Sequence, residues 1–190
     1  RQMCIRDRDI AGLAAVCKAR GVPLLVDNAH GAYLHFLPGG SRPPIALGAA
    51  MCCDSGHKTL PVLTGGAYLH LGPDAPVQDE ATVRNTLNLF GSTSPSYLIL
   101  QSLDQCNAVL AGDYRARLAG CCAALEVLRK ALNETAAAHG AVLPLALPGN
   151  PPDREPLKLT LDAAALGCSG QALAEVLRQH GIECEYAAVS

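Results

Sequence analysis

The chain has 190 residues, of which 49% are hydrophobic and 17% are charged, and its formal net charge is −2. This composition supports a buried core and excludes a disordered chain, while the lack of a basic block and an aromatic content of 4% argue against a nucleic-acid partner. No apolar run approaches the roughly 20 residues that a membrane span needs. Nine cysteines are an odd number for a disulfide framework, so we expect reduced thiols in a cytoplasmic protein.

The two ends of the chain set the expected limits of the folded part. The first eight residues, RQMCIRDR, resemble a translated sequencing adapter, so we predict that 1–8 are a non-native leader. The chain does not begin with methionine, and it stops at Ser190 shortly after an expected strand. We therefore expect a fragment that is truncated at both ends.

From Asp9 onwards the chain alternates between helical and strand-like patterns. Asp9 as an N-cap, an amphipathic stretch and Gly21 just beyond it predict a first helix. A Gly- and Pro-rich loop is expected at 31–44. Short apolar runs predict three buried strands, at 24–27, 49–53 and 66–71. This order favours an α/β fold with a mostly parallel sheet.

The next part of the chain is rich in alanine, leucine, arginine and glutamate, which favour helix. These residues predict three helices, at 79–90, 95–110 and 113–139. Five prolines between 143 and 156 predict a connection between two domains.

Beyond the prolines, the pattern predicts a small α+β domain that begins but is not completed. Its expected elements are a strand at 157–161, a helix at 169–180 and the start of a strand at 182–186. The predicted organisation is a large domain, a connection and a small domain, at 9–142, 143–156 and 157–190.

Two polar motifs, VDNAHG at 26–31 and DSGHKT at 54–59, each follow a predicted buried strand. Open α/β sheets bind ligands at the carboxyl ends of their strands. A carboxylate, Asp27, and a lysine, Lys58, at neighbouring strand ends suit pyridoxal phosphate. That cofactor needs a lysine for covalent attachment and a carboxylate that keeps its pyridine nitrogen protonated.

Four segments occur in order: VDNAHGA at 26–32, DSGHKTLP at 54–61, GSTSPSY at 91–97 and PLKLT at 156–160. Together they resemble the Orn/Lys/Arg decarboxylase family, over nearly all of 9–190. The resemblance implies part of the large domain of a fold-type-I, aspartate-aminotransferase-like enzyme that depends on pyridoxal phosphate. It also implies decarboxylation of lysine, ornithine or arginine to cadaverine, putrescine or agmatine, amines of polyamine biosynthesis.

The resemblance implies a role for each matching residue of the first motif and for the lysine. Lys58 matches the lysine that binds the cofactor covalently, and Asp27 matches the partner of the pyridinium nitrogen. Ala29 would pack under the cofactor ring, and His30 would lie near its phenolic oxygen.

Five further residues match family positions. Ser55 and His57 would contact the cofactor phosphate or orient the lysine, and His57 or the lysine itself would return a proton to the substrate α-carbon. Thr93 and Ser94 match a loop that reaches the phosphate of a neighbouring subunit, which implies a homodimer or higher oligomer with shared active sites. Glu185 matches a glutamate near the distal cationic group of the substrate.

The chain departs from the family at Asn28, Tyr33 and Gly56, where glutamate, histidine and threonine are frequent, and these departures leave the substrate open. Two alternatives to a decarboxylase stay in view. One is another fold-type-I enzyme, an aminotransferase or a carbon–carbon lyase. The other is a catalytically silent, truncated chain that only takes part in oligomerisation.

The remaining cysteine, histidine and basic residues are interpreted as structural and not as functional. Cys52 and Cys53, with His30, His35, His57 and His70, could indicate zinc, but adjacent strand residues point to opposite faces and cannot easily share one tetrahedral ion. No metal is therefore expected. The cysteines at 121–122 lie in an alanine- and leucine-rich predicted helix and are expected in the hydrophobic core. Four basic residues are expected on a solvated helix face: Arg115, Arg117, Arg129 and Lys130.

Overall fold

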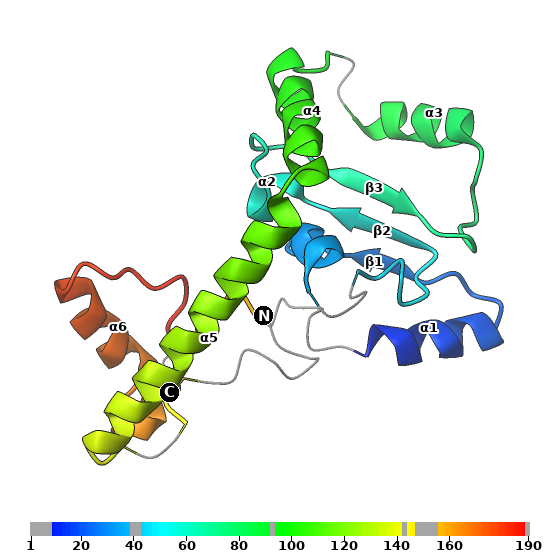
Figure 1. The fold of residues 1–190 in the computed structure, drawn as a ribbon. Helices are drawn as coiled ribbons and strands as arrows, with labels where there is room; N and C mark the ends of the chain where they lie inside the picture. Colours follow the sequence, from blue (N-terminus) through cyan, green and yellow to red (C-terminus); the bar gives the residue numbers. More distant parts are fainter. Residues whose placement is uncertain (1–8, 39–42, 92–93, 142–143, 147–155, 189–190) are drawn as a thin grey trace. The chain divides into compact units, whose positions relative to one another are not determined.

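The computed structural model describes residues 9–38, 43–91, 94–141, 144–146 and 156–188 (Figure 1). The chain divides into two compact units, at Arg1–Ala119 and Gly120–Ser190. The first unit contains a small sheet with helices, and the described part of the second unit is mainly helical. The structure is therefore a mixed α/β fold.

Helix α1 (Ile10–Ala19) begins and ends as its sequence predicts. The Asp9 carboxylate accepts a hydrogen bond from the backbone N–H of Gly12, and Gly21 follows the helix with a φ of 65°. That left-handed conformation is readily adopted only by glycine. The side chains of Ile10 and Ala14 are buried, which anchors this helix in the first unit.

Three short strands, β1 (Leu25–Asp27), β2 (Met51–Asp54) and β3 (Tyr68–Leu71), form one sheet in the order β1-β2-β3 (Figure 1). The three predicted strands are confirmed. The prediction of a mostly parallel sheet is wrong, because β1 and β2 are parallel but β3 is antiparallel to β2. The helix between β2 and β3, α2 (Gly56–Thr59), has four residues. Such a helix rises about 6 Å, too little to return the chain to the starting edge of the sheet.

The sheet is buried on one face only. Val26 and Cys52 are 8% and 1% exposed and pack with Ala49, whereas Leu25 is 60% exposed. The prediction of buried strands therefore holds for one face of this sheet and not for the other. The predicted loop at 31–44 also contains a short 3₁₀ helix, η2 (Ala32–Phe36), within its described part.

The three helices predicted after the sheet are confirmed as α3 (Glu80–Phe90), α4 (Tyr97–Ala111) and α5 (Tyr114–Ala138). Side chains at the N-caps explain where the first two begin. Asp79 accepts a hydrogen bond from the N–H of Thr82, and Ser96 accepts one from the N–H of Ile99. These caps satisfy backbone donors that have no partner inside the helix.

The described part of the second unit contains η3 (Ala163–Leu166) and α6 (Gly170–Gln179), the latter as predicted. The strands predicted at 157–161 and 182–186 are wrong: within the described residues this unit has one isolated bridge, Ala146–Leu161. The carbonyls of Pro156 and Lys158 accept hydrogen bonds from Arg129 Nη2 at 2.8 and 2.7 Å, so an arginine occupies acceptors that a strand would use.

Two expectations about helix α5 are also wrong. Arg129 is 2% exposed rather than solvated, and Cys121 is exposed rather than in a core. The buried residues of α5 are Leu118, Arg129 and Ala136, whose spacing defines one stripe of the helix. Position 121 lies off this stripe.

The other three basic residues lie on the surface. Arg117 and Lys130 have side chains that are 74% and 77% exposed, as predicted. Arg115 is also exposed, but its guanidinium lies 5.8 Å from the ring centroid of Phe36 and donates a hydrogen bond to the carbonyl of His35. It therefore ties the start of α5 to η2 within the first unit.

Candidate active site

The two polar motifs meet at one edge of the sheet. Asp27 is the last residue of β1 and is paired in register with Cys53 of β2, and α2, which carries Lys58, begins at Gly56 just after β2 ends. Since β1 and β2 are parallel, both motifs follow the carboxyl ends of neighbouring strands. Open α/β sheets bind their ligands at this edge.

The lysine and a histidine of the first motif are in contact. Lys58 is exposed, and its Nζ lies 3.5 Å from Nε2 of His30. A tight turn brings His30 back toward the second motif: the N–H of Gly31 donates to the carbonyl of Asn28 at 2.8 Å. A Cβ at Gly31 would collide with the Asn28 side chain, so this turn requires glycine. The structure therefore brings His30 and Lys58 together across 28 residues of sequence.

Asp27 lies on the exposed face of the sheet. Among the residues that the structure describes, none donates a hydrogen bond to its carboxylate. The next residue continues the ladder, because the N–H of Asn28 donates to the carbonyl of Cys53 at 2.9 Å. Ala29 is half-buried in the following turn. A carboxylate is thus presented at the sheet edge with its oxygens available to a ligand.

His57 is oriented by the turn before β3. Its Nδ1 lies 3.2 Å from the carbonyl of Gly66, to which the backbone N–H of His57 also donates. A carbonyl can only accept, so Nδ1 carries the proton in this contact and Nε2 of a neutral ring is left as an acceptor. Ser55 is the N-cap of α2, but its hydroxyl makes no capping hydrogen bond.

The remaining predicted residues belong to other segments or lie outside the described chain. Thr93 is outside the described residues, and Ser94 is exposed before α4. Glu185 belongs to the second unit, where Lys158 Nζ donates to its two carboxylate oxygens at 2.9 and 2.7 Å. The contact that the resemblance implies for Glu185 therefore stays a prediction.

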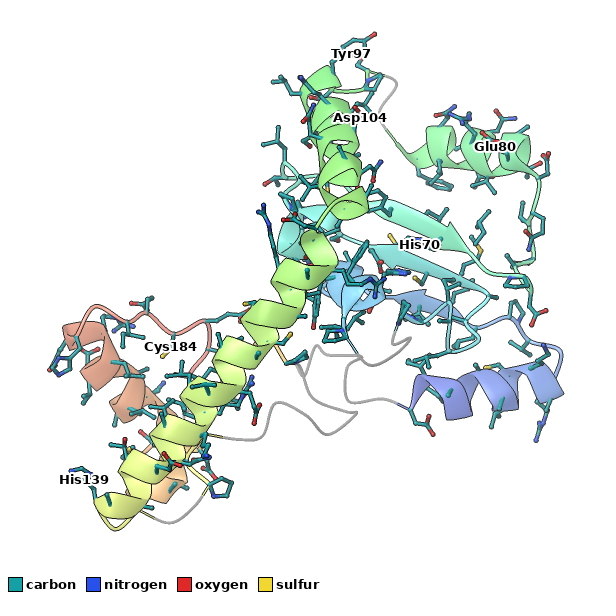
Figure 2. The ribbon with its side chains drawn as sticks, viewed as in Figure 1. His70, Glu80, Tyr97, Asp104, His139 and Cys184 are labelled. Carbon is teal, nitrogen blue, oxygen red and sulfur yellow. The ribbon has the colours of Figure 1, made fainter. Side chains whose placement is uncertain are left out.

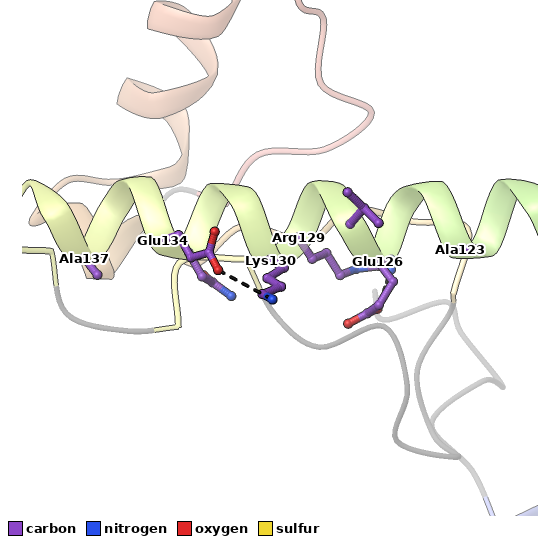
Figure 3. A pocket seen from close by; sticks show the side chains of 8 residues that line it. Ala123, Glu126, Arg129, Lys130, Glu134 and Ala137 are labelled. Atoms are coloured by element: carbon purple, nitrogen blue, oxygen red, sulfur yellow. Dashed lines mark hydrogen bonds and ion pairs between the residues drawn. The ribbon is translucent and has the colours of Figure 1, made fainter.

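A surface pocket in the second unit does not coincide with the motifs. Its lining residues, which include Glu126, Lys130 and Glu134, all belong to α5 (Figure 3). They recur every three or four positions, so the pocket is one face of a single helix. Lys130 and Glu134 form an ion pair there at 3.8 Å. None of the residues predicted to bind the cofactor lines it.

One cluster of polar side chains was not predicted. Asp54 is fully buried, and its Oδ2 lies 3.1 Å from Nε2 of His70 and 3.5 Å from Nε2 of His35. Its Oδ1 accepts a hydrogen bond from Asn28 Nδ2 at 2.7 Å. Burial alone would raise the pKa of the Asp54 carboxyl, but the polar groups of His35, His70 and Asn28 outweigh it and hold that pKa well below its usual range.

A sequence signal exists for part of this cluster. Residues 52, 54 and 70 fall on one face by strand alternation and cross-strand pairing, once β2 and β3 are known to be antiparallel. His35 carries no such signal, because it lies in a 3₁₀ helix inside the predicted loop.

An α/β sheet with a lysine and a carboxylate after adjoining parallel strands is an arrangement suited to pyridoxal phosphate enzymes. The model of the Orn/Lys/Arg decarboxylase major domain matches residues 9–148, and the chain belongs to this family. Members of the family depend on pyridoxal phosphate.

Three relatives illustrate the similarity. The Bacillus subtilis protein YaaO, which is uncharacterized, is 36% identical over 171 residues, covering 88% of this chain and 34% of YaaO. An arginine decarboxylase of Halalkalibacterium halodurans is 27% identical, covering 88% of this chain and 34% of that enzyme. An arginine decarboxylase of Bacillus anthracis is 26% identical, with 93% and 36% covered. The chain therefore spans about a third of the length of these relatives.

Within the described ranges, the helices are too short or too polar to cross a membrane.

Proposed function

We propose that the protein decarboxylates a basic amino acid (lysine, ornithine or arginine) with pyridoxal phosphate as its cofactor, in the cytoplasm. The observation that carries the proposal is the placement of Lys58, in contact with His30, at the same sheet edge as the available carboxylate of Asp27. Family membership supports the reaction class, and two relatives named arginine decarboxylase make arginine the first substrate to test.

The residues at this edge fit the cofactor. When bound, pyridoxal phosphate accepts the electron pair released as the bond to the substrate carboxylate breaks. Lys58 would hold the cofactor covalently, and its exposed amine is reachable for that bond. Asp27 would hold the proton on the pyridine nitrogen through a charge-assisted hydrogen bond. No described residue competes for this carboxylate by donating a hydrogen bond to it.

The neighbouring side chains have separate tasks. Ala29, directly after Asn28 in the turn, is small enough to leave room under a planar ring, and His30 would donate to the phenolic oxygen. Lys58, once released by the substrate, is the group we propose to return a proton to the α-carbon. His57 is the alternative donor, through Nε2, because its Nδ1 is engaged by the Gly66 carbonyl. We assign the phosphate to Ser55 and to Thr93 and Ser94 of a second subunit.

An exposed apolar surface supports the proposed homodimer. Large apolar side chains are exposed around the end of α3 and the start of α4, at Leu89, Phe90, Tyr97 and Leu98. The exposed fractions of Phe90 and Tyr97 are 88% and 82%. Exposed aromatic side chains are typical of interaction surfaces, and Thr93 and Ser94 lie between Phe90 and Tyr97 in sequence.

The dimer is tested by sedimentation of Phe90→Glu. A charge at this position should shift the dimer to monomer, because an unpaired carboxylate would be buried at the interface. Val127→Glu, at an exposed position of α5, is the matched control and should sediment as the parent does. Equal sedimentation of the Phe90 variant and the parent would place the interface elsewhere.

For the substrate site, we propose that Glu185 binds the distal cation of the substrate. Its exposed carboxylate is held by Lys158, so a substrate guanidinium or ammonium would take the place of that lysine. Glu185→Gln should then raise KM with little change in kcat.

The function itself is tested by release of carbon dioxide from arginine, lysine and ornithine. The protein is expressed from its complete open reading frame and supplied with pyridoxal phosphate, and Lys58→Ala is compared with Lys130→Ala, a change of another exposed lysine. We expect carbon dioxide and the matching amine from one substrate, loss of activity in the first variant and none lost in the second. An amine-group transfer or an aldol-type cleavage without carbon dioxide would overturn the reaction class. No turnover of any kind would favour a silent chain.

A further inference from the structure

Three potential metal ligands from three separate segments meet on the buried face of the sheet. His35 belongs to η2, and Asp54 ends β2. His70, which is labelled in Figure 2, lies in β3. One ligand atom of each lies within 4.8 Å of the other two. Asp54 shares its sheet face with Cys52, whose cross-strand partner is His70, whereas Asp27 lies on the opposite face. The cluster is therefore distinct from the candidate cofactor site.

Two of the three separations between these atoms are close to those around a single ion. Asp54 Oδ2 lies 3.1 Å from His70 Nε2 and 3.5 Å from His35 Nε2. Two ligands that each bind a tetrahedral zinc ion at about 2.0–2.1 Å are about 3.3 Å apart. A small movement of side chains would thus bring all three atoms to bonding distance of one ion.

The carboxylate is already oriented for this task. Its other oxygen, Oδ1, accepts from Asn28 Nδ2 at 2.7 Å and from Cys52 Sγ at 3.7 Å, which leaves Oδ2 facing the two imidazoles. Such outer hydrogen bonds are the usual means by which proteins fix a metal-binding carboxylate. A glutamate at position 28 would instead place a second negative charge against Asp54, so the amide of Asn28 and the buried carboxylate are suited to each other.

One ligand atom lacks a satisfactory partner. Nε2 of His35 is buried and makes no hydrogen bond of good geometry with any described residue, although it faces Asp54 at 3.5 Å. Leaving a buried polar atom unpaired costs free energy, and a bound cation would remove that cost. The backbone around it is held in place, because Arg115 Nη2 donates to the His35 carbonyl at 3.0 Å.

We propose that His35, Asp54 and His70 bind one divalent transition-metal ion, with zinc as the best match. Two imidazoles and one carboxylate are a donor set that zinc accepts, with a fourth position left for water. The side chains of the two histidines are 29% and 31% exposed, so an ion can enter from solvent. The ion would join η2, β2 and β3, and so brace the segment that carries His30 against the strand that precedes Lys58.

Cobalt(II) is the probe, because its visible spectrum reports both geometry and donor type. The full chain is stripped with EDTA and titrated with Co²⁺, then with Zn²⁺ in competition. We expect one equivalent of cobalt, with visible bands of a four-coordinate site and no near-ultraviolet thiolate-to-cobalt band. Zinc should displace the cobalt. His35→Ala and His70→Ala should each weaken binding at least about 100-fold.

His180→Ala is the matched control, because His180 is an exposed histidine in the other unit, and it should bind cobalt as the parent does. Circular dichroism shows whether each variant is folded. Should the histidine variants unfold, Asn28→Ala, which removes a hydrogen bond but no ligand, should still weaken binding about tenfold. No cobalt spectrum in the parent, a thiolate band, or unchanged binding in the folded variants would overturn the proposal. Attachment of pyridoxal phosphate to Lys58, which is tested separately by borohydride reduction and peptide mass spectrometry, does not depend on these outcomes.

Discussion

The two faces of the three-stranded sheet are built from alternate residues of the same strands, yet they differ in nearly every respect. On one face Val26, Cys52 and Asp54 are at most 8% exposed, and the single charge among them is surrounded by polar partners. On the other face Asp27 and Cys53 are exposed, and Asp27 accepts no hydrogen bond from a described residue. The carboxylate of the first face is engaged by partners within the chain, and the carboxylate of the second is available to a ligand.

The buried carboxylate of one face therefore contributes to stability, and the exposed carboxylate of the other is the better candidate for a function. A carboxylate that is buried and fully partnered contributes to the fold, because losing a partner leaves a desolvated charge. An exposed carboxylate contributes little to stability, so a folding requirement does not explain Asp27 as well as a binding role does. Substitutions on the two faces should therefore affect different measurements.

The largest expected effect is on the exposed face of the sheet, which carries Asp27. Asp27→Ala should lower turnover in the proposed decarboxylation by orders of magnitude, because the proposed cofactor would lose the carboxylate that holds the proton on its pyridine nitrogen. The free energy of unfolding, measured in urea, should change by no more than about 0.5 kcal/mol, as for other exposed substitutions. Carbon dioxide release and urea titration of the same sample measure both. Parent-like turnover would remove Asp27 from the site.

The two adjacent cysteines of β2, Cys52 and Cys53, lie on opposite faces of the sheet, so their reactivities compare the two faces. Burial, followed by the charge of Asp54, raises the pKa of the Cys52 thiol to about 12. The raised pKa keeps this thiol protonated at pH 8, with about a thousandfold less thiolate than an ordinary cysteine. Burial and the Asp27 charge also raise the pKa of Cys53, but its side chain is exposed.

We therefore expect iodoacetamide to modify Cys53 slowly at pH 8, faster as pH rises, and to leave Cys52 unmodified while the chain is folded. Peptide mass spectrometry over a time course measures the two rates. In urea both should react alike. Equal rates in the folded chain would show that the two faces are equally accessible.

On the buried face of the sheet, Asn28→Ala should lower the free energy of unfolding by about 2 kcal/mol, because the buried carboxylate of Asp54 loses its amide donor. Urea unfolding in EDTA measures this without a contribution from metal. Asn85→Ala, at an exposed position of α3, is the control and should change stability by no more than about 0.5 kcal/mol. A neutral result for Asn28 would mean that water replaces the amide.

The smallest expected effect compares neighbouring apolar residues of β1. Val26→Ala removes two buried methyl groups and should cost about 1.5 kcal/mol. Leu25→Ala, at a side chain that is 60% exposed, should cost no more than about 0.5 kcal/mol in the isolated chain. Thermal and urea unfolding of the pair measure the difference. A larger loss for Leu25 would show that its face is covered in solution.

Local signals predicted the helices and strands of the first unit well. Asp9 predicted the start of α1 because capping depends on one side chain and the backbone beside it. The direction of β3 was not predictable in this way, since alternation along a strand does not depend on which way its neighbour runs. The strand predicted at 182–186 failed for a related reason: a sequence that alternates apolar and polar residues forms a strand only when another strand pairs with it.

For the candidate site, the structure tests the placement of the strand ends, and the roles of its residues stay predictions. Placing Asp27 and Lys58 together required only that two strands be parallel neighbours, and the structure has them so. The surroundings of Asp54 required the fold of a loop, because His35 lies within it. The burial of Arg129 was likewise hidden, since arginine on a helix is usually solvated and its backbone acceptors come from a distant segment.

The central claim is that Lys58 binds pyridoxal phosphate. The protein expressed from its complete reading frame is incubated with the cofactor, reduced with borohydride, digested and examined by peptide mass spectrometry. The account predicts one phosphopyridoxyl group, on the peptide that contains Lys58, and its loss in Lys58→Ala but not in Lys130→Ala. Absence of the label from that peptide, in protein that is folded by circular dichroism, would contradict the account.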